Sequence, residues 1–155
     1  MHKLPTVDAV ALTLTTFLRR KVQVVTATPP DRLPILGLYR STADHNVASC
    51  ECDVAFAAIT AAAFALIPAA VAHESVKANQ LDESLQEIYG EVLNVLSRLF
   101  ADTDGVRITL SSTTFPPSPL PESMSQRPAG GVVSFEVSVD GYGKGLLSLG
   151  LLEAV

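Results

Sequence analysis

The sequence predicts an α+β domain in which a mainly antiparallel β-sheet packs against helices. Apolar residues recur at helical spacing in three segments, and short runs with strand character lie between and after them. An Asp-Gly pair near the C-terminus is typical of a tight turn between antiparallel strands. The 155 residues are the length of one ordinary domain with its own core, and no linker divides them. We expect a single domain over residues 1–155.

The order of elements follows from where the periodicity changes. A first helix is expected from Val7 to Leu18, started by Pro5 and Thr6 and followed by basic residues that suit a helix C-terminus. The elements expected after it are strands at 22–26, 35–40 and 47–52, an alanine-rich helix at about 54–71, a helix at about 80–101, a half-buried strand around 106–110, and a hairpin of 132–139 and 142–151.

The helix at about 80–101 has the clearest two-sided pattern. Asn79 is a suitable cap, and Asp82 and Glu83 fall in the first turn, where acidic residues are favoured. Tyr89 and Phe100 lie beside the apolar stripe and are expected to pack. The predicted core stripe consists of Leu85, Ile88, Val92, Val95, Leu96 and Leu99.

Composition excludes several classes of function. The formal charge is −5, only 6% of residues are aromatic and there is no Trp, so we expect no binding to nucleic acid. Apolar residues make up 48% of the chain and charged residues only 17%. That ratio is high for a soluble monomer and indicates an extra buried surface, so a homodimer is expected.

The uncharged run from Val54 to Ala72 raises the alternative of a membrane span. It is rich in alanine, Pro68 interrupts it, and Asp53 and His73 bound it closely, so a buried helix explains it better. We expect no membrane insertion. The N-terminus also lacks the apolar core of a signal peptide, and a cytoplasmic location is expected.

Cys50 and Cys52 occupy alternate positions of a predicted strand, so both side chains face the same way. That spacing disfavours a disulfide between them, and no second Cys or His pair accompanies them as a zinc site would require. We expect two reduced, buried thiols and no metal site.

A polar stripe runs along the helix at 80–101, opposite its apolar residues. It consists of Ser84, Glu87, Glu91, Asn94 and Arg98. One interpretation is a solvated helix face with an Asn94–Arg98 contact. However, Glu87 and Glu91 are like charges four residues apart, which costs a few tenths of a kcal/mol and would suit a cationic partner. The Asn94 carboxamide can accept and donate hydrogen bonds, so it can hold a water in one orientation.

These residues match a known signature. Glu91-x-x-Asn94, followed by twenty-two residues and then Pro117, resembles the motif of the CheC/CheX/FliY phosphatases of bacterial chemotaxis. The family pattern has Asp or Ser four positions before the Glu, where this chain has Glu87. The length and the order of elements are similar to the single-site CheX branch.

The resemblance implies hydrolysis of the aspartyl-phosphate on the receiver domain of a response regulator. Asn94 would orient the attacking water and Glu91 would engage the receiver's active-site lysine, with Ser84, Glu87, Arg98 and Pro117 as partner contacts. The receiver would supply Mg²⁺, so no cofactor is expected in this chain. The sequence accordingly offers no Ser-His-Asp set, and the glycine-rich stretch 141–145 lacks the P-loop arrangement.

Two alternatives remain open. The chain could be a non-catalytic CheX-like binding module that docks a receiver domain or a flagellar switch component, or a plain oligomeric scaffold. The phosphatase hypothesis requires Glu87, Glu91 and Asn94 to be exposed together on one unobstructed helix face. The irregular segment 115–131, which holds five of the ten prolines, is expected to be a surface loop.

Overall fold

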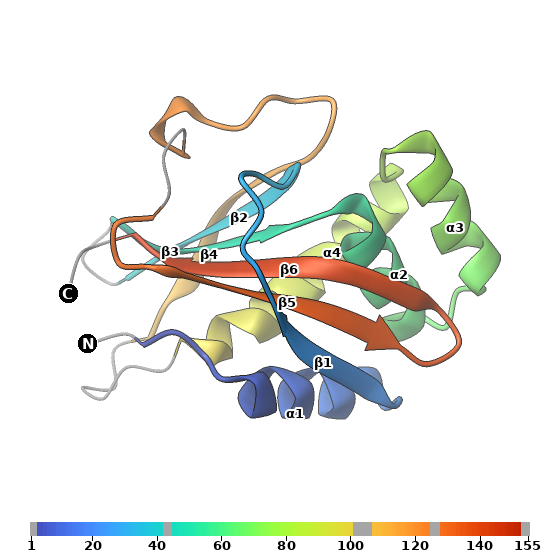
Figure 1. Cartoon of the computed structure of the whole chain (residues 1–155). Coiled ribbons are helices and arrows are strands. Elements are labelled where there is room, and N and C mark those ends of the chain that lie inside the picture. Colours follow the sequence, from blue (N-terminus) through green and yellow to red (C-terminus); the bar gives the residue numbers. More distant parts are fainter. Residues whose placement is uncertain (1–2, 42–44, 101–106, 125–127, 153–155) are drawn as a thin grey trace.

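The computed structural model describes residues 3–41, 45–100, 107–124 and 128–152, and it confirms the α+β fold (Figure 1). Within these ranges the chain forms helices α1 (Val7–Leu18), α2 (Val54–Phe64), α3 (Ala69–Ala78) and α4 (Glu83–Leu96), the short 3₁₀ helices η1 (Ser97–Leu99) and η2 (Glu122–Met124), and strands β1 (Val22–Ala27), β2 (Ile35–Arg40), β3 (Asn46–Cys52), β4 (Thr109–Thr114), β5 (Val132–Val139) and β6 (Gly143–Leu151).

The six strands form one antiparallel sheet in the order β1-β5-β6-β3-β2-β4. Strands β2 and β3 are buried along almost all of their length and β6 along its second half, because a helix layer covers one face and crossing segments cover part of the other. The edge strands β1 and β4 carry more exposed residues.

The helix layer and the sheet enclose the main core. Alternate residues of the strands, including Ile35, Tyr39, Phe135 and Leu147, point toward α1, α2 and α4 and are buried. Cys50 and Cys52 belong to the same layer and are free, fully buried thiols, as the alternation predicted. Helix α3 packs mainly on α2 at one end of the molecule (Figure 1).

Two irregular segments cover part of the opposite, outer face of the sheet. The chain leaves edge strand β1 and crosses in front of β5 and β6 to reach β2 (Figure 1), and Arg32 in this crossing pairs with Glu51 of β3. The second is the proline-rich segment that follows β4, whose Met124 packs with Leu36 and Leu38 of β2. The outer face is less covered over β1 and over the turn-side ends of β5 and β6, where Gln23, Val25 and Lys144 are exposed.

The prediction of one helix at 54–71 is wrong, because this segment contains the end of one helix and the start of another. Helix α2 ends at Phe64, and Leu66 adopts the left-handed conformation with φ of 58°. The amides of Leu66 and Ile67 donate to the carbonyls of Ala63 and Ala62, which closes the helix end. Pro68 then starts α3. Within the described ranges no helix combines the length and apolar character that crossing a membrane requires.

The helix predicted at 80–101 is shorter than expected. Asn79 ends α3 in the left-handed conformation and does not start α4, whose cap is Asp82. The buried stripe is also rotated slightly from the prediction. Ile88 and Val95 are only half-buried, whereas Tyr89 and Leu93 are fully buried. The burial of Tyr89 and Phe100 agrees with their predicted packing role.

Two smaller predictions need correction. The strand expected around 106–110 lies at Thr109–Thr114, and Val106 is outside the described residues. The hairpin turn has three residues, 140–142, and not two, because Val139 pairs with Gly143. The amide of Tyr142 donates to the carbonyl of Val139 within this turn.

Candidate functional site on helix α4

Helix α4 begins at Asp82, whose Oδ1 accepts a hydrogen bond of 2.8 Å from the amide of Leu85. Its strongly two-sided sequence then directs one face into the core. The buried residues of α4 are Leu85, Tyr89, Val92, Leu93 and Leu96. Because this face packs into the core, the opposite face of α4 is held toward solvent.

The predicted site residues lie on that opposite face. Ser84, Glu87, Glu91 and Asn94 are all exposed and all belong to α4. Glu91 and Asn94 are separated by about 4.5 Å along the helix axis and lie on the same side. Arg98 is also exposed, but it follows the end of the α-helix and belongs to η1.

The acid–amide face of α4, meaning Glu87, Glu91 and Asn94, is not engaged within the protein. In the part of the chain that the structure describes, none of these three side chains makes a hydrogen bond or an ion pair, and the Asn94–Arg98 contact is not formed. Their hydrogen-bonding groups are available to water or to a partner.

The backbone beneath Asn94 is held by three contacts. The Tyr39 hydroxyl donates to the carbonyl of Leu93 at 2.7 Å, and the Ser97 hydroxyl donates to the carbonyl of Asn94 at 2.6 Å. Gly37 of β2 lets α4 approach closely, since a Cβ there would lie 3.0 Å from the Leu93 side chain. The turn that carries Asn94 is therefore fixed to the sheet.

Gly90 leaves open space beside Asn94. It lies one turn earlier on the same flank of α4, and a Cβ built on it would meet no other atom within 4 Å. A partner could therefore approach the helix backbone closely at this position. Gly90 was not among the site residues predicted from the sequence.

Pro117 lies beside the first turn of α4 and not beside Asn94. It is exposed and lines a hollow of about 530 Å³ together with Asp82, Glu83 and Gln86. Gln86 and Asn94 are separated by about 12 Å along the helix. The loop that carries Pro117 is anchored by Phe115, whose ring packs edge-on against Tyr89 with the ring centroids 6.3 Å apart. The structure therefore brings Glu87, Glu91 and Asn94 together, while Pro117 stands near the Ser84 end.

The buried face of α4 carries no charge. The Tyr89 hydroxyl and the Cys52 thiol are 3.1 Å apart in the core. Burial raises the pKa of Tyr89 well above its ordinary value, and burial likewise raises the pKa of Cys52. Both groups stay neutral at ordinary pH, so the electrostatic character of α4 comes from its exposed side.

The residues that position the face were not among those predicted from the sequence. Tyr39 and Gly37 lie on β2, far from α4 in sequence, and no local signal connects them to it. Ser97 could have been recognised, because a hydroxyl three residues after Asn94 is well placed to bond that residue's carbonyl.

Fold and site together define a class: a helix-on-sheet domain that presents two carboxylates and a carboxamide from one helix, with no His or Cys among them. Solved structures with the same fold include FliY from Thermotoga maritima, with a TM-score of 0.61, 16% identity, and coverage of 91% of this chain and 81% of FliY.

CheX from Vibrio vulnificus is similar with a TM-score of 0.58 and 15% identity, covering 95% of this chain and 93% of CheX. FliM from H. pylori, in its complex with FliG, is similar with a TM-score of 0.57 and 7% identity, covering 92% and 84%. No family model matches the chain, and no curated protein matches its sequence. The expected resemblance to the CheC/CheX/FliY proteins is thus confirmed at the level of the fold.

Proposed function

We propose that this protein hydrolyses the aspartyl-phosphate of a response-regulator receiver domain, with Asn94 orienting the water. One observation carries the proposal: Glu87, Glu91 and Asn94 are exposed together on α4 without an intramolecular partner among the described residues. Side chains that build a fold are normally engaged within it, whereas these three are free to meet another molecule.

The chemistry requires little from this chain. The receiver contributes the acyl phosphate, its Mg²⁺ and a lysine, and what it lacks is a water placed for in-line attack. The Asn94 carboxamide oxygen accepts a hydrogen bond from that water and so aims its lone pair at phosphorus. Glu91 accepts from the receiver's lysine and orients the complex. Glu87 lies one turn before Glu91 and contacts the rim of the docked receiver.

The decisive experiment follows the decay of a phosphorylated receiver with and without this protein. We expect the wild type to accelerate the decay. The acceleration by Asn94→Ala should be about a hundredfold smaller, because the water is no longer positioned. Alanine is a good helix former at this exposed site, so α4 should persist. Equal acceleration by both proteins would reject catalysis through Asn94.

The role of Glu91 is tested by charge reversal. Glu91→Lys should weaken receiver binding by about tenfold or more, because it places like charges opposite each other. Glu74→Lys is the matched control, since it reverses an exposed carboxylate on α3, away from the acid–amide face. If the two variants bind the receiver equally well, Glu91 does not contact it.

A second candidate is a non-catalytic docking module. The solved FliM structures with this fold include complexes of H. pylori FliM with FliG and with SpeE, so that protein uses the scaffold in protein complexes. A receiver that binds the acid–amide face without faster dephosphorylation, or a flagellar switch component that binds the chain instead, would favour this candidate.

We also propose a homodimer. Large apolar side chains are exposed on elements other than α4, among them Leu12 on α1, Val25 on β1 and Leu66 after α2. A dimer formed through such surfaces would leave the exposed face of α4 accessible to a receiver.

A further inference from the structure

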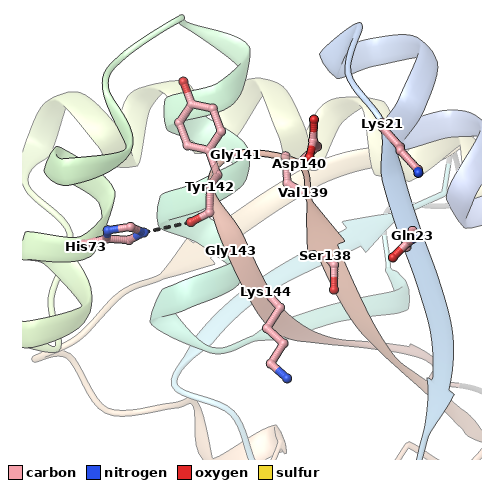
Figure 2. A pocket seen from close by; sticks show the side chains of 10 residues that line it. All are labelled: Lys21, Gln23, His73, Ser138, Val139, Asp140, Gly141, Tyr142, Gly143 and Lys144. Atoms are coloured by element: carbon pink, nitrogen blue, oxygen red, sulfur yellow. Dashed lines mark hydrogen bonds between the residues drawn. The ribbon is translucent and has the colours of Figure 1, made fainter.

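A second hollow lies on the open part of the outer sheet face, at the β5–β6 turn (Figure 2). It has a volume of about 670 Å³, within the range of small-molecule sites. Its polar strand residues Gln23, Ser138 and Lys144 point to the face of the sheet opposite α4, so they are separate from the acid–amide face. Its lining includes Lys21, Gln23, His73, Ser138 and Lys144, together with the turn 139–143.

Four polar side chains line one side of this hollow. Gln23 of β1 pairs with Ser138 of β5, and Ser138 pairs with Lys144 of β6, so the three lie in adjacent positions across the sheet. Lys21 precedes β1 by one residue and shares the face of Gln23. Figure 2 shows Gln23 and Ser138 between the two lysines. The arrangement therefore presents two ammonium groups flanking an amide and a hydroxyl.

Lysines outnumber carboxylates in the lining of the hollow, which holds Lys21, Lys144 and Asp140. Lys144 is 3.7 Å from Glu136, but both side chains are well exposed and such a pair is weak. Among the described residues, Lys21 has no carboxylate partner. The Asp140 carboxylate points away from Ser138 and Lys144 (Figure 2). This positive surface stands out on a chain whose net charge is −5.

The wall of the hollow is anchored. The His73 Nε2 on α3 lies 2.8 Å from the carbonyl of Tyr142, and the Tyr142 hydroxyl donates to the carbonyl of Ile67 at 2.7 Å. The Arg20 guanidinium donates to the carbonyl of Asp140 and lies over the Tyr142 ring. Gly141 and Gly143 have φ of 82° and 123°, so side chains there would be strained and none fills the space.

We propose that this hollow binds a small anion that carries phosphate groups. The two lysines would bind phosphate oxygens as point charges, and the Gln23 amide and Ser138 hydroxyl would donate to the remaining oxygens. The turn is not a P-loop, since no helix follows it and its lysine projects from a strand. The inference goes beyond the proposed function, because it concerns a different face and a different ligand.

Calorimetry with pyrophosphate at low ionic strength tests the site. We expect the wild type to bind pyrophosphate and the double variant Lys21→Gln/Lys144→Gln to bind it at least about tenfold more weakly, because two charge-assisted contacts are lost. The control is Lys3→Gln/Lys77→Gln, which removes the same charge from exposed lysines outside the hollow. The control should bind like the wild type.

Three results would overturn the proposal: no binding of pyrophosphate by the wild type, equal weakening in both double variants, or wild-type affinity in the hollow variant. Amide chemical shifts provide a second measurement that does not depend on a variant folding. On titration of the wild type, the signals of Gln23, Ser138 and Gly143 should shift while those of Glu91 and Asn94 do not. Shifts confined to α4 would also reject the site.

Discussion

A single hydrogen bond from the sheet fixes the position of the C-terminal end of α4. Tyr39 is fully buried, and its hydroxyl reaches the Leu93 carbonyl across 54 positions of sequence. That carbonyl also accepts the helical bond from the amide of Ser97. Tyr39 is therefore a positioning residue, because it acts on Asn94 only through the backbone next to it.

Tyr39→Phe should lower the free energy of unfolding by about 1 kcal/mol, the usual net contribution of one buried hydrogen bond. It should also reduce receiver dephosphorylation, because the turn carrying Asn94 is less firmly held. Tyr142→Phe is the matched control, since its hydroxyl bonds the Ile67 carbonyl at the same 2.7 Å, away from α4. Urea unfolding and receiver decay measure both effects. If both variants change the decay equally, Tyr39 is only structural.

Asp53 makes stability depend on pH. It caps α2 and also accepts from the amide of Leu146 on β6. Burial raises its pKa from the ordinary 3.8, and the bonds from backbone amides oppose this only in part. The folded state therefore holds the proton more tightly than the unfolded chain, and the free energy of unfolding falls as pH rises from 3.8 through the folded pKa.

Asp53→Asn keeps an acceptor at the cap but does not titrate there. We expect the stability of the wild type relative to this variant to fall with rising pH in that window, measured by urea unfolding at a series of mildly acidic pH values. A difference between the two proteins that stays constant, or grows with pH, would contradict the raised pKa.

At the scale of elements, two glycines differ in the space that surrounds them. A Cβ on Gly145 of β6 would lie 2.4 Å from the backbone nitrogen of Phe56 at the start of α2, and backbone cannot move aside easily. Gly90 of α4, in contrast, faces open space. The same substitution should therefore have opposite effects at these two positions.

Gly145→Ala should destabilise the protein by about 1–3 kcal/mol through overpacking. Gly90→Ala should stabilise it by about 0.5–1 kcal/mol, because alanine favours the helix and meets no neighbour. Chemical denaturation of the two variants beside the wild type measures both. A destabilising Gly90→Ala, or a neutral Gly145→Ala, would show that these helices do not pack as described.

For the whole molecule, the proposed dimer and the proposed function constrain each other. Sedimentation should give a dimer, and the exposed residues Leu12, Val25 or Leu66 should become protected from hydrogen exchange or labelling on association, while Glu91 and Asn94 remain accessible. A dimer that covers the exposed face of α4 would contradict phosphatase action. A monomer at all concentrations would reject the dimer but leave the α4 proposal intact.

Local patterns predicted the elements whose signal is contained within them. Helix α1 starts and ends as its spacing indicated, and β2 and β5 have the predicted bounds. The break at Leu66 was missed although Pro68 interrupts the run, because a left-handed residue that is neither Gly nor Asn gives no capping signal of its own. The turn at 140–142 was misjudged by one residue, because the register of two strands sets its length.

The sequence by itself determined the α+β class, the two-sided character of α4, and the order in which Glu87, Glu91 and Asn94 follow one another, since periodicity is a local property of a chain. Only the tertiary structure decided that Tyr39 and Gly37 hold α4, that Pro117 lies near its start, and that Lys21 and Lys144 flank one hollow. Those relations depend on strand pairing and helix packing between distant segments, which local spacing does not encode.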